Sequence, residues 1–262
     1  MVKASELIEQ IEAFAPKSLA EPGDPTGLQI GQPEQKIHRV LTTLDVRPEV
    51  VQEAIDLGAD FIWAHHEAMF RPAKNLDLSD PQNAMYALAI KNNIVIYASH
   101  TNLDAAAGGL NDWLCQAFGI ENQIPLLPGE GDQPGMGRIG ELKAAMTMAD
   151  FAKQVKAVCQ VDAVRLIAND ANKVVKRVAV LGGDGGKFWK KAQEAGADLY
   201  LTADLYYHVG HDILAADFAV LDPDHHMEAV AKEPMAKKVQ EWFAWQLPVT
   251  ASQKNTDPYT YF

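Results

Sequence analysis

The chain contains 262 residues, a length that fits one large domain or two smaller ones. Its hydrophobic content of 48% and its charged content of 22% are those of an ordinary globular protein, which excludes the disordered, collagen-like and low-complexity classes. The formal net charge of −12 disfavours general binding to nucleic acids or to anionic membranes, because both are negatively charged.

Cysteine usage and the absence of apolar segments indicate the compartment. Cys115 and Cys159 are far apart in the sequence, so neither a disulfide framework nor a thiolate metal site is expected. Residues 1–14 lack the continuous apolar segment of a signal peptide, and no run of 18 apolar residues occurs in the chain. We therefore expect a cytoplasmic protein without a membrane-spanning segment.

The first half of the chain alternates helices and strands. The spacing of apolar residues, with proline and glycine at the ends, predicts helices at 5–14, 48–58, 81–93 and 110–118. Runs of β-branched and aromatic residues predict strands at 39–46, 59–66 and 94–100, and segment 23–31 is predicted as a loop. This alternation is typical of βαβ units in a parallel sheet.

A second set of elements follows the Gly- and Pro-rich segment 126–137. The predicted strands are 138–146, 163–168, 177–183, 197–204, 218–223 and an edge strand at 247–253, and the predicted helices are 149–159, 187–196, 207–216 and 235–246. The expected fold class is α/β, with two α/β lobes whose mainly parallel sheets are flanked by helices. The expected first lobe is 1–125, completed by 221–262, and the second is 126–220.

Histidines follow three of the predicted strands. His65 comes directly after FIWA (61–64), His100 after IVIYAS (94–99), and His225 lies two residues beyond FAVLDP (218–223). Ligands of open α/β sheets bind outside the carboxyl ends of the strands. The three groups are therefore expected to converge at one edge.

The residues of these groups suit divalent transition metals. Asp104 lies in a loop of small residues, and His225 and Glu228 share one face of a helix because they are three residues apart. Adjacent residues of an extended chain point to opposite sides, so we expect a turn at the strand end to direct His65 and His66 to two different ions. An adjacent histidine pair alone is more often a surface or hydrogen-bonded feature, but the combination favours two divalent ions (zinc, iron, manganese, nickel or cobalt).

Other motifs are less specific. The loop LGGDGGK (181–187) has neither the P-loop spacing nor GxGxxG, so its glycines are interpreted as a tight turn, and dinucleotide binding is disfavoured. The chain contains no GxSxG motif, which disfavours a serine hydrolase. His208 follows another predicted strand, which makes it a candidate for a supporting role at the same edge.

Six segments together resemble a known family, and they are HHEAMF (65–70), SHTNLDAAAGGLNDWL (99–114), GRIGEL (137–142), TADLYYHVGHD (202–212), DPDHHMEAV (222–230) and TDPY (256–259). In order and spacing, the chain resembles the Nif-three-like family of dinuclear metal-centre hexameric proteins, often named GTP cyclohydrolase 1 type 2 homologs. The resemblance extends along nearly the whole chain and is to the short form, without an inserted extra domain.

The resemblance implies a metal site between the two lobes and a ring-shaped homohexamer with the sites facing a central cavity. The ligands that it implies are His66 with Asp104 on one ion, His65 with His225 on the other, and Glu228 as the bridge.

The chain also departs from the family pattern. Glu67 stands where the family usually has proline, and Asp224 stands where it usually has glycine. The early segment GDP (23–25) replaces a WDN-like sequence and retains only Asp24. These changes affect the shape, charge or metal preference expected of the site.

The first functional hypothesis is a metal-dependent hydrolase. A metal-bridging hydroxide would attack a nucleotide or another phosphate ester, and His100 or His208 would act as general acid or base. The family name GTP cyclohydrolase is one version of this chemistry. The alternative is a non-enzymatic hexameric protein that binds or handles metal, or regulates through interactions with partners.

Overall fold

The computed structural model describes residues 2–129, 131 and 133–262 and divides into two compact units. Unit 1 comprises Met1–Leu103 and Ala231–Thr256, and unit 2 comprises Asp104–Val230 and Asp257–Phe262. From the sequence, we expected the lobe boundaries between residues 125 and 126 and between residues 220 and 221. Glu130 and Asp132 of the expected break at 126–137 lie outside the described residues.

The sheet of unit 1 has the strand order β13-β4-β5-β6-β2. Its strands are β2 (Gly27–Ile30), β4 (Val40–Thr43), β5 (Phe61–Ala64), β6 (Val95–Ala98) and β13 (Val249–Ala251). The neighbours from β13 to β6 are parallel, as expected, and β13 is an edge strand. Segment 23–31, predicted as a loop, contains β2, which pairs antiparallel with β6. A short antiparallel pair, β1 (Val2–Lys3) and β3 (Lys36–Ile37), stands apart from this sheet.

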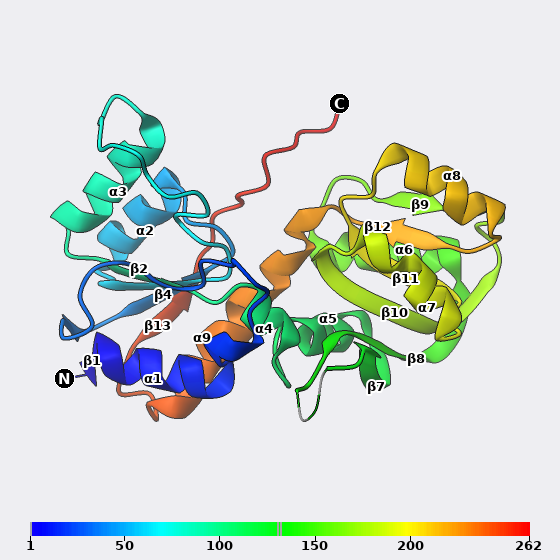
Figure 1. The fold of residues 1–262 in the computed structure, drawn as a ribbon, viewed down its shortest axis with the longest axis horizontal. Helices are drawn as coiled ribbons and strands as arrows, with labels where there is room; N and C mark the ends of the chain where they lie inside the picture. Colours follow the sequence, from blue (N-terminus) through cyan, green and yellow to red (C-terminus); the bar gives the residue numbers. More distant parts are fainter. Residues whose placement is uncertain (1, 130, 132) are drawn as a thin grey trace. The chain divides into compact units, whose positions relative to one another are not determined.

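Helices cover both faces of this sheet (Figure 1). They are α1 (Ala4–Phe14), α2 (Pro48–Leu57), α3 (Pro81–Lys91) and α9 (Lys232–Trp242), with a 3₁₀ turn η1 (Lys17–Leu19). Leu41, Ile62 and Ile96 pack with buried residues of α2 and α3. Side chains in a strand alternate between the faces, and accordingly Trp63 lies on the other face, against Trp242 of α9. The predicted amphipathic helices thus bury their apolar sides on the sheet.

Unit 2 contains a mixed sheet with the order β7-β8-β10-β11-β12-β9. The strands are β7 (Ile120–Leu127), β8 (Met136–Thr147), β9 (Arg165–Ile167), β10 (Val174–Asp184), β11 (Leu199–Ala203) and β12 (Val220–Asp222). The β10–β11 and β11–β12 pairs are parallel, whereas β7–β8, β8–β10 and β12–β9 are antiparallel. The glycine-rich segment 126–137 therefore connects two strands of one sheet, rather than two lobes.

The helical elements of unit 2 and its boundary are α4 (Thr101–Ala105), α5 (Leu110–Phe118), α6 (Met148–Cys159), η2 (Gly186–Phe188), α7 (Trp189–Glu194), α8 (Tyr207–Ala215) and η3 (His225–Ala231). Trp189 and Ile213 of α7 and α8 pack with Ala179 and Tyr200 of the sheet. The chain division at Leu103 and Asp104 falls inside α4.

The two cysteines give a direct test of the packing of unit 2. Cys115 and Cys159 are buried free thiols in α5 and α6, and burial raises the pKa of each to about 12. We expect native protein at pH 8 to react with Ellman's reagent at least about 100-fold more slowly than protein unfolded in urea, because the thiolate is the reactive form. Equal rates in the native and unfolded protein would contradict this packing.

Candidate functional site

Three histidines of unit 1 lie at the carboxyl edge of its sheet. His65 and His66 directly follow β5, and His100 follows the neighbouring parallel strand β6. The ring centroids of His65 and His66 are 4.9 Å apart, and that of His100 is 5.5 Å from His65 and 5.6 Å from His66. The parallel pairing of the two strands therefore brings the three imidazoles together.

Hydrogen bonds orient the first two of these rings. Nδ1 of His65, a fully buried residue, donates to the carbonyl oxygen of Ser99 at 2.9 Å. Nδ1 of His66 donates to Oδ1 of Asp45 at 2.7 Å, and the hydroxyl of Thr256 donates to the other oxygen of that carboxylate at 2.5 Å. An imidazole whose Nδ1 carries the proton presents Nε2 as a lone-pair donor, which is the usual arrangement of a metal-binding histidine.

In unit 2, the imidazole of His225 is also oriented by a hydrogen bond from its Nδ1. His225 begins η3, and its Nδ1 donates to Oδ2 of Asp204 at 2.5 Å. Its Nε2 lies 3.1 Å from Oε2 of Glu228, whose side chain is only 2% exposed. Burial lowers the pKa of His225, but the hydrogen bonds and charges of Glu228 and Asp204 outweigh burial and raise it to about 10. The imidazole between two carboxylates therefore carries a proton on both ring nitrogens, and a positive charge, at neutral pH. A metal ion at Nε2 would replace the proton on that nitrogen.

Gly182 and Gly183, at the end of β10, lie directly against these two side chains. A Cβ atom on Gly182 would stand 2.9 Å from Oε1 of Glu228, and one on Gly183 would stand 3.1 Å from Nε2 of His225. Gly183 also has a φ of +62°, a conformation that favours glycine. The segment LGGDGGK was interpreted as a tight turn, but its residues 181–184 end strand β10 and Gly186 begins η2. The two glycines at the strand end leave room for Glu228 and His225.

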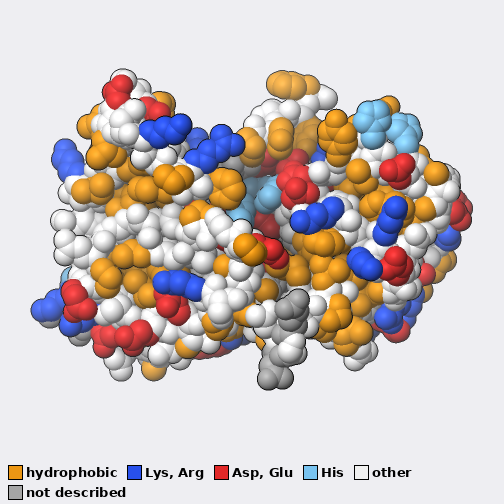
Figure 2. All heavy atoms as spheres, in the orientation of Figure 1, with side chains coloured by type: hydrophobic (Ala, Val, Ile, Leu, Met, Phe, Trp, Pro, Cys, Tyr) orange, Lys and Arg blue, Asp and Glu red, His pale blue; other side chains and the backbone are white. Residues whose placement is uncertain are grey.

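Asp104 and His208 occupy different environments. Asp104 is buried in α4, and its carbonyl accepts from the side chain of Asn111, which also accepts from the backbone N–H of Gly182. His208 is exposed on α8, with its ring 5.4 Å from that of Tyr207. Figure 2 shows histidine side chains at the surface over this helix. Of the expected site residues, Asp104 is therefore linked through Asn111 to Gly182 of β10, whereas His208 lies at the surface.

Sequence reasoning did not identify the residues that orient the histidines. Asp45 lies two residues after β4, and Asp204 lies directly after β11, so both stand at carboxyl ends of strands. An acidic residue at such a position is the signal that could have identified them. Glu67, noted only as a departure from the family pattern, lies beside His100, with Oε1 3.0 Å from Nδ1.

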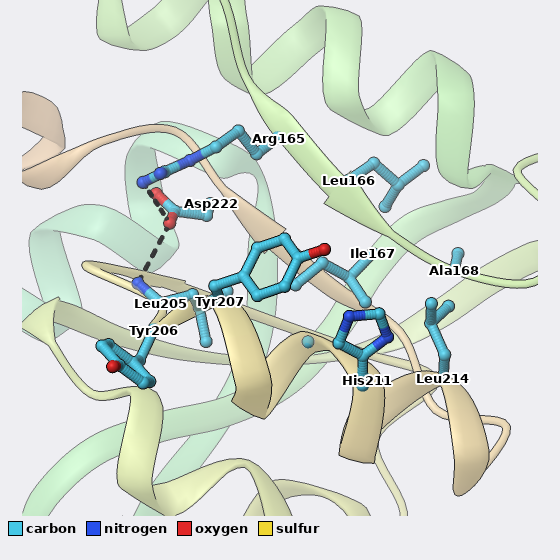
Figure 3. Close-up of a pocket in the computed structure, with 11 residues that line it drawn as sticks. Arg165, Leu166, Ile167, Ala168, Leu205, Tyr206, Tyr207, His211, Leu214 and Asp222 are labelled. Atoms are coloured by element: carbon cyan, nitrogen blue, oxygen red, sulfur yellow. Dashed lines mark hydrogen bonds and ion pairs between the residues drawn. The ribbon is translucent and has the colours of Figure 1, made fainter.

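A separate pocket of about 370 Å³ lies between α8 and β9 in unit 2 (Figure 3). Tyr207 and His211 lie at its mouth, and Arg165 donates to the buried carboxylate of Asp222 at 2.6 Å on one side. Its lining includes none of the expected metal ligands.

The fold and these side chains define a mixed α/β protein in which both units carry histidine and carboxylate residues suited to divalent metal ions. The model of the family Duf34/NIF3 (NGG1p interacting factor 3) matches residues 2–258, and the chain belongs to this family. The resemblance inferred from the motifs is thereby confirmed.

Relatives and solved structures agree with this assignment. The chain is 42% identical over 262 residues to the GTP cyclohydrolase 1 type 2 homolog of Streptococcus pneumoniae, with 98% of each chain covered. It is 39% identical over 260 residues to the protein of the same name from Lactococcus lactis, with 98% of this chain and 99% of the relative covered. The crystal structure of a Bacillus cereus protein related to NIF3 matches with a TM-score of 0.95 and 30% identity, covering 100% of this chain and 99% of that one. Among the described helices, none is long and apolar enough to cross a membrane.

Proposed function

We propose that this chain binds two divalent metal ions through His65, His66, Asp104, His225 and Glu228. The observation that carries the proposal is that Nδ1 of His65, of His66 and of His225 each donates to an oxygen atom, as in the usual metal-binding histidine. Imidazole and carboxylate groups together suit zinc, iron, manganese, nickel and cobalt. Two such ions would lower the pKa of bound water and stabilise negative charge on a substrate oxygen.

We further propose that the protein is a metal-dependent hydrolase of phosphate esters, nucleotides among them. GTP is the first nucleotide to test, since the relatives carry the name GTP cyclohydrolase 1 type 2 homolog. His100 and His208 are the candidates for proton transfer to or from the substrate. The buried carboxylates of Asp104 and Glu228 reduce the positive charge that the ions bring.

Turnover of substrate by matched variants tests the hydrolase. Metal-loaded protein is incubated with GTP or p-nitrophenyl phosphate, and product is compared between wild type, His65→Ala/Glu228→Ala, His208→Ala and His211→Ala. We expect turnover in wild type, none in the double variant, and a loss of about 100-fold or more in His208→Ala if it transfers the proton. His211→Ala is the control, because His211 is exposed on the same helix. Equal rates in wild type and the double variant would contradict the proposal.

The exposed position of His208 supports a second candidate, a hexameric metal-handling protein without turnover. Storage or delivery of metal needs no proton-transfer group, and His208 is exposed on α8 rather than held among the candidate ligands of its unit. Wild-type protein that binds metal but converts neither substrate, and whose metal content is unchanged in His208→Ala, would favour this candidate.

Gly182, near the end of β10, gives a further prediction for metal affinity. In Gly182→Ala the new methyl group would displace the Glu228 carboxylate, since Cβ would stand only 2.9 Å from Oε1. We expect the affinity for Zn²⁺, measured by competition with a chromophoric chelator, to fall about 10- to 100-fold. Gly186→Ala is the matched control, because its Cβ would meet no atom closer than 3.4 Å. Equal affinities of the two variants would show that the close approach of Gly182 does not position Glu228.

A further inference from the structure

Three polar side chains from separate loops of unit 1 meet at the carboxyl edge of its sheet. Glu67 follows β5, and His100 follows the neighbouring strand β6. Asp24 precedes β2, which runs antiparallel to β6 with Gly27 opposite Ala98. The start of β2 therefore lies beside the end of β6, and the topology brings the three loops to one place.

The distances within this group match those between ligands of one metal ion. Nδ1 of His100 lies 3.0 Å from Oε1 of Glu67 and 3.2 Å from Oδ2 of Asp24. One ligand atom from each of the three residues lies within 4.8 Å of the others. With metal–ligand bonds of about 2.1 Å, neighbouring ligand atoms in a tetrahedral or octahedral shell are about 3.0 to 3.4 Å apart. The three residues thus have the spacing of part of a coordination shell.

The burial of these groups favours an added positive charge. The side chains of Asp24, Glu67 and His100 are 4%, 2% and 22% exposed. Among the described residues, no hydrogen bond reaches Oε1 of Glu67. Two buried carboxylates beside one imidazole are costly without a further cation or proton.

Three hydrogen bonds hold the carboxylate of Asp24 in place. The backbone N–H of Thr101 donates to Oδ2 at 3.0 Å, the hydroxyl of Thr101 donates to the same oxygen, and the backbone N–H of Thr26 donates to Oδ1 at 3.1 Å. A carboxylate fixed in this way is typical of a metal ligand with supporting hydrogen bonds.

We propose that Asp24, Glu67 and His100 form an additional binding site for a divalent cation, separate from the ions proposed above. Two carboxylates and one imidazole suit Mn²⁺ in particular, and three protein ligands leave positions for water. A cation on Nδ1 withdraws that nitrogen of His100 from proton transfer, which leaves His208 as the other candidate for that role.

Binding of Mn²⁺ to the variant His65→Ala/Glu228→Ala tests the site. Free Mn²⁺ is counted by its electron paramagnetic resonance signal during titration of the folded protein with MnCl₂. We expect this variant to bind about one Mn²⁺ per chain. The further changes Asp24→Asn and Glu67→Gln, which retain size and remove charge, should abolish that binding. Asp60→Asn, which alters the exposed His38–Asp60 pair, is the control and should not change it.

Two results would overturn the additional site. One is the absence of Mn²⁺ binding to His65→Ala/Glu228→Ala, and the other is binding that persists after Asp24→Asn and Glu67→Gln. If the combined variant does not fold, His100→Ala in the same background serves in its place and must lose the ion. The metal site of the proposed function is tested separately, by comparing wild type with His65→Ala/Glu228→Ala. If wild type binds no more ions than this double variant, the proposed function fails, whereas the additional site does not.

Discussion

Replacement of His66 by alanine is expected to weaken binding of Zn²⁺ by about 100-fold or more. Changes to residues that merely orient a ligand typically cost 10- to 100-fold in affinity, and His66 is proposed as a ligand itself. Its imidazole is oriented by Asp45 and lies 4.9 Å from the ring of His65. Competition of the protein with a chromophoric chelator measures the dissociation constant.

His38 provides the matched control for this change. It is also paired through Nδ1 with a carboxylate, that of Asp60 at 2.7 Å, but its side chain is 63% exposed. We expect His38→Ala to bind Zn²⁺ as wild type does. If His66→Ala and His38→Ala had the same affinity, His66 would not be a ligand.

Replacement of Trp63 by alanine is expected to lower the free energy of unfolding by about 3 to 5 kcal/mol. Trp63 is fully buried in β5, packs 5.7 Å from the ring of Trp242, and donates its Nε1–H to the hydroxyl of Ser99 at 3.0 Å. The change leaves a large cavity and an unmade buried hydrogen bond. Unfolding in urea, followed by circular dichroism, measures the effect.

Trp245 is the control for this substitution. It belongs to the same unit and is 75% exposed, so Trp245→Ala should change stability by no more than about 0.5 kcal/mol. Equal losses in the two variants would show that Trp63 does not contribute to the core as described. Because Ser99 also accepts from Nδ1 of His65 through its carbonyl, the Trp63 variant should also bind Zn²⁺ more weakly.

The positions of the histidines were predictable from the sequence because strand ends are visible in the pattern of apolar residues. His65, His66 and His100 follow buried runs, and the carboxyl ends of parallel strands meet at one edge. The partners that orient them depend on strand order and register, which a single sequence does not contain. Thr43 of β4 pairs with Ala64 of β5. Asp45 and His66, each two residues further along the chain, therefore lie opposite each other.

The same reasoning applies to unit 2. Leu201 of β11 pairs with Leu221 of β12, which places Asp204 level with the residue before His225. That residue is Asp224, which has a φ of +74°, a conformation that favours glycine and that aspartate tolerates. Asp224 therefore has a backbone conformation that glycine adopts more readily, at a position where the family pattern has glycine.

The elements that the sequence did not predict depend on pairing partners. Strand β2 lies in a segment rich in glycine and proline, and its extended form is stabilised by β6 rather than by its own composition. Strand β7 lacks the alternation of buried and exposed residues that predicts a strand, because most of its residues are exposed. Its extended conformation is stabilised by pairing with β8. In the second sheet the pair β7–β8 is antiparallel, and so are β8–β10 and β12–β9, whose direction depends on strand order. The expectation of mainly parallel sheets therefore describes unit 1 better than unit 2.

Elemental analysis of metal per chain tests the central claim most directly. Untagged wild-type protein and His65→Ala/Glu228→Ala are loaded with Zn²⁺, dialysed and compared at equal chain concentration. The proposed function predicts that wild type holds about two ions per chain more than the double variant. Equal metal content in the two proteins would contradict it.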